Sequence, residues 1–358
     1  MTFLKLALLF GFYELWRHIT SGGRTRRAAI RSCEVVTMDS TLPEDVMIEI
    51  LARLPVKSLL RSGSCNGLIC LSDEKTFMVI CNPATNEYIE VPFNLDEIEK
   101  ITGWFNLSFG HDPHTDNYKV VRIDMYFSSA SIGDPGHCNV YVYTLGTKQW
   151  RRIQTPPYRL AYGRTPYLNG SLHWVELGNI SRWDHRRQFT NCKSIISFDL
   201  KSEKFQEVPW FTFPDSKLRR RRSVGVLQGC LSTYVSYPDK GLTEIWLMKQ
   251  YGVEQSWTKL FSINFPFLPS HRFVPLVVRR KGEILLKRQY RGGLPWRVCG
   301  RNNTYAYDPI NNKVHEYDLG NIDLIDIHAY VESLVSIVSY SGGKTKDENN
   351  KQQRNGVS

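Results

Sequence analysis

The strongest constraint on the fold is a short unit that recurs along the chain. Each copy has a strand end, a polar turn, and an aromatic or β-branched residue six positions after its first residue. The copies lie at 82–92, 112–123, 144–153, 199–209 and 308–319, with Tyr88, Tyr118, Trp150, Phe205 and Val314 at that sixth position. Asp or Asn at the head of a turn bonds its own backbone two residues on, and Pro or Gly sets the bend. The unit therefore predicts repeated β-hairpins.

Two-residue turns mark the partner strands of these hairpins. They are Asn66-Gly67, Asn169-Gly170, Gln228-Gly229 and Lys281-Gly282, and they precede the apolar runs LICL, LHWV, LSTYV and ILLK. A turn of this type between apolar runs is a strong hairpin signal. With these turns included, the unit recurs at roughly 50 residues, which is the range of kelch-like propeller blades.

Hairpins at this period need lateral neighbours to bury both faces, and the radial packing of a propeller supplies them. We therefore predict a mainly β chain folded as a kelch-like β-propeller, with an irregular β-sandwich as the alternative. A chain of 358 residues, 42% of them hydrophobic, is long enough for a sizeable core. The sequence divides into an N-terminal extension (1–40), a helical segment (41–61), the propeller (62–340) and a disordered tail (341–358).

The N-terminal extension opens with the apolar stretch MTFLKLALLFGFYELW. Its apolar residues recur at steps of three and four and predict an amphipathic helix: Leu4, Leu8, Phe12, Leu15 and Ile19. A secretory signal is the alternative, although no convincing small-residue cleavage site follows. The run is too short to span a bilayer. A basic linker, RTRRAAIR, comes next.

The stretch TLPEDVMIEILARLPVKSLLR predicts two short helices. Thr41 can cap the first helix, and Pro43 fits its first turn. Ile50 and Leu54 belong to one broad apolar face, and Pro55 ends this helix and can open the second. Two helices this apolar need a third helix, or another protein, to cover them.

This segment resembles the opening of an F-box of the large plant class, from Leu42-Pro43-Glu44-Asp45 to Leu59-Leu60-Arg61. The resemblance implies docking on the Skp-family adaptor of a cullin–RING ubiquitin ligase. It gives six residues the role of facing the adaptor or of holding the helices that do: Leu42, Pro43, Ile50, Leu54, Pro55 and Leu59.

The F-box resemblance stops at Arg61. The family continues with a third helix rich in Phe, Arg and Cys that ends in Lys-Ser-Trp, whereas here Arg61 runs at once into SGSCNGLICL. We interpret the join as a partial F-box (41–61) fused to a strand, which a missed exon, an alternative splice or a deletion would each produce. The missing segment would also carry early strands. We therefore expect an incomplete ring, in which the closing segment 326–337 lacks its mate.

The remainder resembles the F-box-associated domain of plants. The matching stretches are SCNGLICL, GHDPHTDNYKVVRI, YLNGSLHWV, IISFDLKSEKFQEVP and EIWLMKQYGVEQSWTKLFSI, and the resemblance covers about 42–338. It implies a propeller that holds a target protein, within the substrate-recognition subunit of an SCF-type (Skp–cullin–F-box) E3 ubiquitin ligase. The partial F-box leaves an alternative, a binding module uncoupled from the ligase. An RNA- or anion-binding module is a third hypothesis.

The sequence lacks motifs of catalysis. It has no Walker-type loop, no GxSxG, no HExxH and no CxxC pair. Its eight cysteines are scattered, mostly in apolar runs, which favours a reducing compartment, the cytosol or the nucleus. His173 alternates with Leu172 and Trp174, so we expect it to be packed. We expect a non-catalytic adaptor without cofactor or metal.

The net charge of +11 includes three basic clusters, SRWDHRRQ, KLRRRR and Arg279–Lys281. The first two lie between repeat units, where long loops project from a propeller, and such clusters can bind acidic peptide, phosphate or RNA. Our candidate substrate surface is Arg182, Trp183, Arg186, Arg187, Arg219, Arg220, Arg221 and Arg222. Trp210 and Trp296 lie beside basic residues or in turn-rich stretches and suit the same role. Solvated loops are the alternative. A membrane partner is not expected, and nucleic acid is disfavoured.

Overall fold

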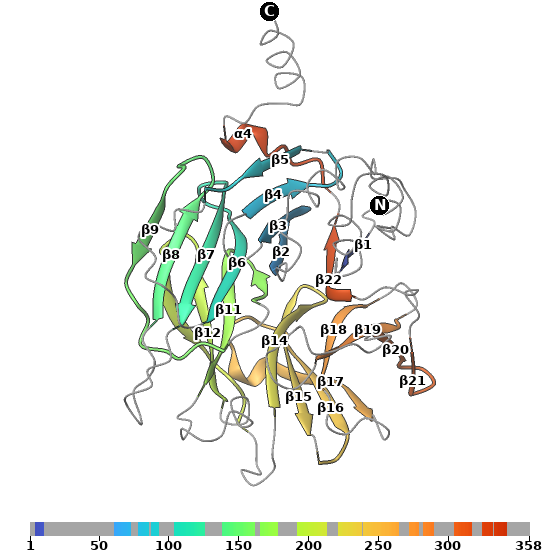
Figure 1. Ribbon diagram of the computed structural model, residues 1–358. Helices are drawn as coiled ribbons and strands as arrows, with labels where there is room; N and C mark the ends of the chain where they lie inside the picture. Colours follow the sequence, from blue (N-terminus) through green and yellow to red (C-terminus); the bar gives the residue numbers. More distant parts are fainter. Residues whose placement is uncertain are drawn as a thin grey trace, which may run out of the picture.

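The chain folds mainly into antiparallel β-sheets that surround a common axis (Figure 1). The computed structural model describes residues 4–10, 61–72, 78–85, 87–92, 104–125, 138–161, 165–177, 192–212, 221–237, 239–264, 272–278, 282–289, 304–316, 324–331 and 333–341. Within these residues, five sheets have four strands each and one sheet has two. The predicted β-propeller is confirmed.

The five four-stranded sheets, here called blades 1 to 5, follow one another along the chain. Blade 1 consists of β2 (Arg61–Cys65), β3 (Leu68–Ser72), β4 (Met78–Asn82) and β5 (Glu87–Glu90). Blade 2 consists of β6 (Trp104–Asp112), β7 (Asn117–Met125), β8 (Cys138–Thr144) and β9 (Trp150–Ile153). Blade 3 consists of β10 (Tyr167–Leu168), β11 (Ser171–Leu177), β12 (Cys192–Asp199) and β13 (Lys204–Val208).

The remaining elements complete the circle. Blade 4 consists of β14 (Arg221–Leu227), β15 (Cys230–Tyr237), β16 (Leu242–Met248) and β17 (Trp257–Asn264), with the short 3-10 helix η1 (Glu254–Ser256) before its last strand. Blade 5 consists of β18 (Arg272–Val278), β19 (Ile284–Gln289), β20 (Thr304–Asp308) and β21 (Lys313–Glu316). The two-stranded sheet joins β1 (Leu4–Phe10) to β22 (Leu324–Val331), and a short helix, α4 (Val338–Ser341), follows.

The inner strands of successive sheets touch in a closed cycle. β2 contacts β6, β6 contacts β11, and β14 lies between β11 and β18. β22 contacts both β18 of blade 5 and β2 of blade 1, so the β1–β22 sheet fills a sixth position between these blades (Figure 1). The expected incompleteness takes the form of a short sixth sheet, and the described strands leave no open side in the ring.

The structure corrects two expectations about the ends of the chain. Leu4–Phe10 forms a strand, so the predicted amphipathic helix is wrong for these residues. This strand pairs antiparallel with β22, from Leu4 opposite Val331 to Leu9 opposite Asp326, so the closing strand does have a mate. A short apolar run suits a helix or a strand equally, and the backbone groups of β22 decide between them here.

The predicted turns form as the sequence requires. Asn66, Asn169 and Gln228 have φ angles of +50°, +49° and +53°, and each precedes a glycine that also has positive φ. These are the backbone angles of two-residue type I′ turns. At the heads of longer turns, the carboxylates of Asp112 and Asp308 accept the backbone N–H two residues on, at 3.0 and 2.9 Å. Local side-chain bonding therefore explains why the repeated unit forms hairpins.

Alternating strand direction gives the ring two different faces. One face, here the tight-turn face, holds the turns between the first and second and between the third and fourth strands of each blade. The other, here the long-connection face, holds the links between second and third strands and between blades. The links at this second face include 93–103, 126–137 and 178–191, all outside the described residues.

Apolar side chains fill the spaces between neighbouring blades. Between blades 1 and 2, Leu68 and Ile80 pack in one buried cluster with Phe109 and Val120. Between blades 2 and 3, Trp174 lies in the corresponding cluster and is almost fully buried. Because every blade is buried on its flanks by its neighbours, the core depends on ring closure. No helix among the described residues is long and apolar enough to cross a membrane.

Candidate interaction faces of the propeller

Most of the residues predicted for binding lie outside the described residues. This holds for the whole adaptor-binding set, Leu42, Pro43, Ile50, Leu54, Pro55 and Leu59, and for Arg182, Trp183, Arg186, Arg187, Arg219 and Arg220. The cluster Arg279–Lys281 and Trp296 lie outside them as well. Arg221 and Arg222 open β14, and the side chain of Arg222 is described.

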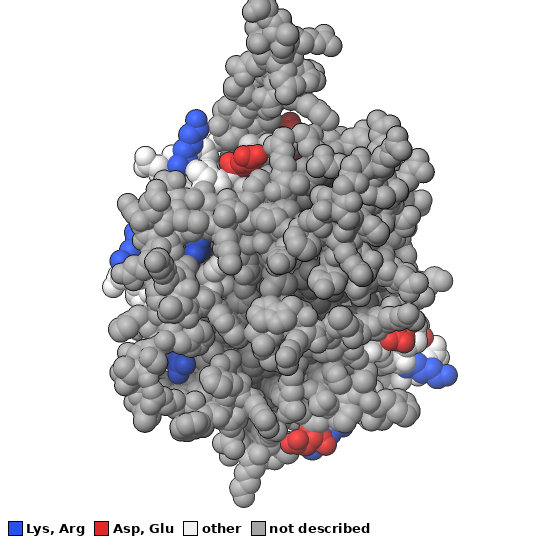
Figure 2. All heavy atoms as spheres, viewed as in Figure 1, with Lys and Arg blue, Asp and Glu red and all other residues white. Residues whose placement is uncertain are grey.

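The strand ends next to the two predicted basic clusters lie at one place in the ring. β11 ends at Leu177 and β12 begins at Cys192, while β13 ends at Val208 and β14 begins at Arg221. All four ends belong to the long-connection face of blades 3 and 4. On the side of the molecule drawn in Figure 2, the described charged side chains appear as small groups of both signs near the edge, with no continuous patch of one sign.

Three tryptophans meet where blades 3 and 4 join at the long-connection face. The Phe211 ring lies 4.3 Å from that of Trp246 and 5.6 Å from that of Trp257. The Trp257 indole N–H donates to the Pro209 carbonyl at 3.0 Å, which ties the end of blade 3 to the last strand of blade 4. Trp210 packs against the same buried cluster. We call Trp210, Phe211, Trp246 and Trp257 the aromatic junction.

Two cations cover rings of the aromatic junction. The guanidinium of Arg222 lies 4.8 Å from the centre of the Trp210 ring, and the ammonium of Lys259 lies 5.4 Å from that of Trp246. Both distances are within the range of cation–π attraction. The structure thus brings together Arg222 and Trp210, which the sequence separately indicated for a recognition surface.

A carboxylate at the junction is held by neighbouring donors. Glu244 is only 8% exposed. Its Oε2 accepts the Tyr237 hydroxyl at 3.0 Å and the Trp246 indole N–H at 3.2 Å, and its Oε1 lies 2.9 Å from the Lys259 Nζ. The charge of Glu244 is therefore neutralised inside the protein.

The indole N–H of Trp210 differs from those of its neighbours. Trp246 donates to Glu244 and Trp257 donates to Pro209, whereas the Trp210 Nε1 atom is buried and has no hydrogen-bond partner. A buried donor without an acceptor is rare in folded proteins. The sequence holds no signal for it, because the acceptor positions depend on the packing of two blades.

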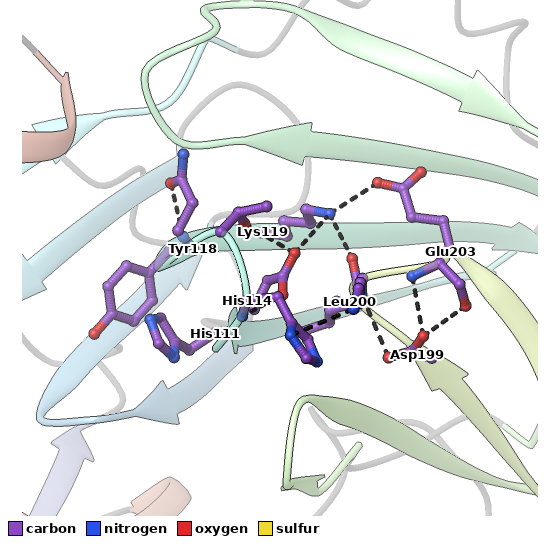
Figure 3. A network of polar contacts seen from close by, with 12 residues as sticks. His111, His114, Tyr118, Lys119, Asp199, Leu200 and Glu203 are labelled. Atoms are coloured by element: carbon purple, nitrogen blue, oxygen red, sulfur yellow. Dashed lines mark hydrogen bonds and ion pairs between the residues drawn. The ribbon is translucent and has the colours of Figure 1, made fainter.

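At the tight-turn face, a polar network connects blades 2 and 3. Figure 3 shows Lys119 of β7 reaching toward Leu200 and Glu203 in the turn between β12 and β13. Its ammonium donates to the Leu200 carbonyl, lies 3.0 Å from Glu203 Oε1, and lies 3.5 Å from Asp112 Oδ2. Lys119 is 7% exposed, so this is a buried ion network between blades.

Asp112 serves both its own turn and the network. Burial alone would raise the pKa of its carboxyl. The hydrogen bonds from His114 and Thr115, together with the Lys119 charge, outweigh burial and hold that pKa below its usual value. Glu203 also pairs with Arg151. Since the charges satisfy one another, the network is better suited to fastening two blades than to holding a ligand.

The C-terminal segment covers part of the tight-turn face. Ile337 is fully buried in the core cluster of blades 1 and 2, and its backbone N–H donates to Glu87 at 2.8 Å. The Asn82 side chain donates to the carbonyls of Ser333 and Val335 at 3.0 and 2.7 Å. The residues 333–341 are thus packed against blades 1 and 2, a role that the sequence did not indicate.

The buried histidine and thiols are poorly placed for chemistry. As the sequence predicts, His173 is packed: it is fully buried, and burial lowers its pKa to about 4. Its Nε2 lies 2.8 Å from the Tyr251 hydroxyl. Burial raises the pKa of Cys65 and Cys81 to about 12, so these thiols stay protonated at neutral pH. The described residues contain no group of three or more His, Cys, Asp or Glu that could hold a metal ion.

Comparison with known proteins agrees with the fold. A family profile described as "F-box associated beta propeller domain" matches residues 28–337. The chain is 30% identical over 227 residues to the F-box protein CPR1 of Arabidopsis thaliana, covering 57% of this chain and 52% of that protein. It is 32% identical over 227 residues to the F-box protein At3g07870 of the same plant, covering 58% and 51%.

A third relative matches over more of the chain. The F-box/LRR-repeat protein At2g43260 of Arabidopsis thaliana is 24% identical over 345 residues, which cover 90% of this chain and 73% of that protein. Against the first two relatives, the chain spans about half of their length.

Proposed function

The chain belongs to the F-box-associated β-propeller family, and from this we propose that it is a substrate-recognition subunit of an SCF-type E3 ubiquitin ligase. In this role, the segment 41–61 docks on a Skp-family adaptor, which links the chain to a cullin–RING ligase. The propeller holds the target protein. The chain acts as a non-catalytic adaptor in the cytosol or the nucleus, because other subunits transfer the ubiquitin.

The observation that carries this proposal is the family match over a ring of six sheet positions. The match extends from residue 28 to residue 337, through all five blades and β22. A ring whose blades are fixed by their neighbours offers a rigid platform on which loops can recognise a partner. Relatives with the same domain are named F-box proteins, which supports the coupling to a ligase.

One observation favours the alternative, a binding module uncoupled from the ligase. β2 begins at Arg61, which lies opposite Ser72 of β3. The first blade therefore starts directly after the last F-box-like residue, Leu60. No sequence lies between them for the third helix that the F-box resemblance implies.

Capture of a Skp-family adaptor by the purified full chain tests the proposal. The comparison is a variant in which a complete third F-box helix is inserted between Leu60 and Arg61, a position that leaves β2 intact. If the unmodified chain captures the adaptor, the first two helices suffice and the proposal stands. If only the restored variant captures it, the alternative holds.

A matched pair of substitutions identifies the docking segment. We expect Ile50→Asp to abolish capture, because a charge on the apolar face opposes its burial against a partner. Ile310→Asp is the control, since Ile310 is 83% exposed in a turn of blade 5. If both variants lose capture equally, residues 41–61 are not the docking segment.

A further inference from the structure

The aromatic junction contains an incomplete copy of an arrangement that is complete beside it. Glu244 is bound by one indole N–H, from Trp246, and by one cation, Lys259. Trp210 and Arg222 supply the same two chemical groups, an indole N–H and a cation 4.8 Å from the ring. The Trp210 N–H has no acceptor, whereas the Trp246 N–H donates to a carboxylate.

We propose that Trp210 and Arg222 form the docking point for a carboxylate on an acidic segment of the target protein. The proposal rests on the function proposed above and names the chemistry of the target. A carboxylate fits because it is an acceptor-only group that can take an indole N–H on one oxygen and a guanidinium on the other. The five N–H donors of Arg222 can serve this contact alongside others.

The geometry favours a peptide carboxylate over a nucleic-acid base. Single-stranded nucleic acid binds such sites by stacking bases on free aromatic faces. Here Arg222 covers a face of Trp210, while Phe211 and Lys259 lie against Trp246. The groups that remain for a ligand are the N–H and the guanidinium, which recognise charge and hydrogen-bond geometry. An acceptor that reaches the buried Nε1 atom must insert at the junction, as a side chain of a docked segment does.

The charge of the sequence around the junction is complementary to an acidic segment. The stretches 178–191 and 213–222, which adjoin the strand ends at this place, contain eight Lys or Arg residues and two Asp residues. Their net charge of +6 is more than half of the chain's +11. Long-range attraction of this sign speeds the encounter with an acidic partner, and the described pair, Trp210 and Arg222, sets its position.

Fluorescence anisotropy with the full chain and a labelled copolymer of Glu and Tyr tests the proposal. Trp210→Phe keeps an aromatic ring and removes the N–H, and Arg222→Met keeps the length of the side chain and removes the charge. We expect each variant to bind the copolymer about tenfold more weakly, the value of one hydrogen bond to a charged group. Arg151→Met is the control, because it removes the same charge from an exposed side chain of β9.

Three outcomes would overturn the proposal. They are no binding of the acidic copolymer by the unmodified chain, equal binding by the Trp210→Phe variant, and an equal loss in the Arg151→Met control. A labelled poly-uridylate RNA is tested in parallel. If the RNA binds more tightly than the copolymer and depends on Trp210 and Arg222, the surface recognises nucleic acid and the proposal is wrong.

A spectroscopic measurement keeps the test valid if a variant fails to fold. In a ¹⁵N-labelled sample, the Trp210 indole resonance is assigned among the nine tryptophans by its loss in the Trp210→Phe variant. We expect the copolymer to shift this resonance downfield, as a new hydrogen bond does, and to leave that of Trp257 in place. An unmoved Trp210 resonance at saturating copolymer contradicts the proposal. Adaptor capture is measured on the same samples, so a failure of the ligase role is recognised separately from a failure of this site.

Discussion

At the scale of single residues, two buried ionic groups of blade 2 differ in how well they are satisfied. Lys119 contacts two carboxylates and a carbonyl oxygen. Asp124 is fully buried, with Oδ1 2.7 Å from the Arg122 Nε and with no hydrogen-bond partner for Oδ2. Burial raises the pKa of Asp124 above its ordinary value of 3.8, although the charge and hydrogen bond of Arg122 oppose this.

The raised pKa of Asp124 predicts a pH-dependent contribution to stability. A carboxyl with a higher pKa in the folded than in the unfolded state stabilises the fold below its unfolded pKa, and this stabilisation is lost as the pH rises through the folded pKa. We therefore expect the Asp124→Asn variant to gain stability relative to the unmodified chain between about pH 4 and about pH 7. Melting temperatures at both pH values measure this. Asp239→Asn, on an exposed residue, is the control. Parallel melting curves for Asp124→Asn and the unmodified chain would contradict the assignment.

Loss of the Lys119 charge is expected to be costly. The Lys119→Met substitution leaves the carboxylates of Asp112 and Glu203 near each other without the buried cation, and we expect a loss of about 3 kcal/mol in the free energy of unfolding. Urea denaturation measures it. Lys201→Met, at an exposed position of the neighbouring turn, should change stability by less than about 0.5 kcal/mol. If the Lys119→Met and Lys201→Met variants are equally stable, the network does not hold the blades together.

At the scale of elements, tight turns make room for the C-terminal segment. Gly67 follows Asn66 in the β2–β3 turn with a φ of +78°, and a Cβ atom there would collide with Ser333. Gly146 has a φ of +86°, and a Cβ atom there would collide with the Tyr340 carbonyl. The turns therefore determine how closely the residues 333–341 approach blades 1 and 2.

Two glycine substitutions separate backbone strain from this close contact. Gly229→Ala places a Cβ atom in open space at a φ of +71°, so it should cost about 1 kcal/mol from the backbone alone. Gly67→Ala should cost clearly more, because Ser333 must move as well. In a chain that ends at residue 332, the two substitutions should cost the same. Chemical denaturation of the four variants measures this, and an unchanged difference after truncation would show that Ser333 is not the cause.

At the scale of the whole molecule, the ring is closed by segments from opposite ends of the chain. β1 and β22 are more than 300 residues apart, and their sheet fills the space between blades 5 and 1. Closure of this kind allows each blade to be buried on both flanks, which is the source of stability in a radial fold. β1 also lies before residue 28, where the family match begins.

Removal of the first ten residues tests this closure. Without β1, β22 loses its pairing partner and its backbone groups are open to water. We expect faster hydrogen exchange at the amides of residues 324–331 that donate to β1, and a lower melting temperature. Removal of residues 1–3, which precede β1, is the control. Unchanged exchange in β22 after the longer deletion would mean that another segment closes the ring.

The sequence by itself determined the hairpins, their turns and the propeller class. The signals are local, because Asn66-Gly67 sets a type I′ turn and Asp308 caps its own loop through atoms a few residues apart. The same local patterns carried the resemblance to the F-box-associated domain. These features follow from chemistry within one short window of the chain, so a single sequence suffices to predict them.

Only the tertiary structure decided what lies together across blades. The pairing of β1 with β22, the contact of Lys119 with Glu203 and the packing of Ile337 between blades 1 and 2 each join distant segments. The unpartnered N–H of Trp210 beside Arg222 is of the same kind. Such contacts depend on the register and spacing of whole sheets, and no local pattern encodes which backbone or side chain will face another when the ring closes.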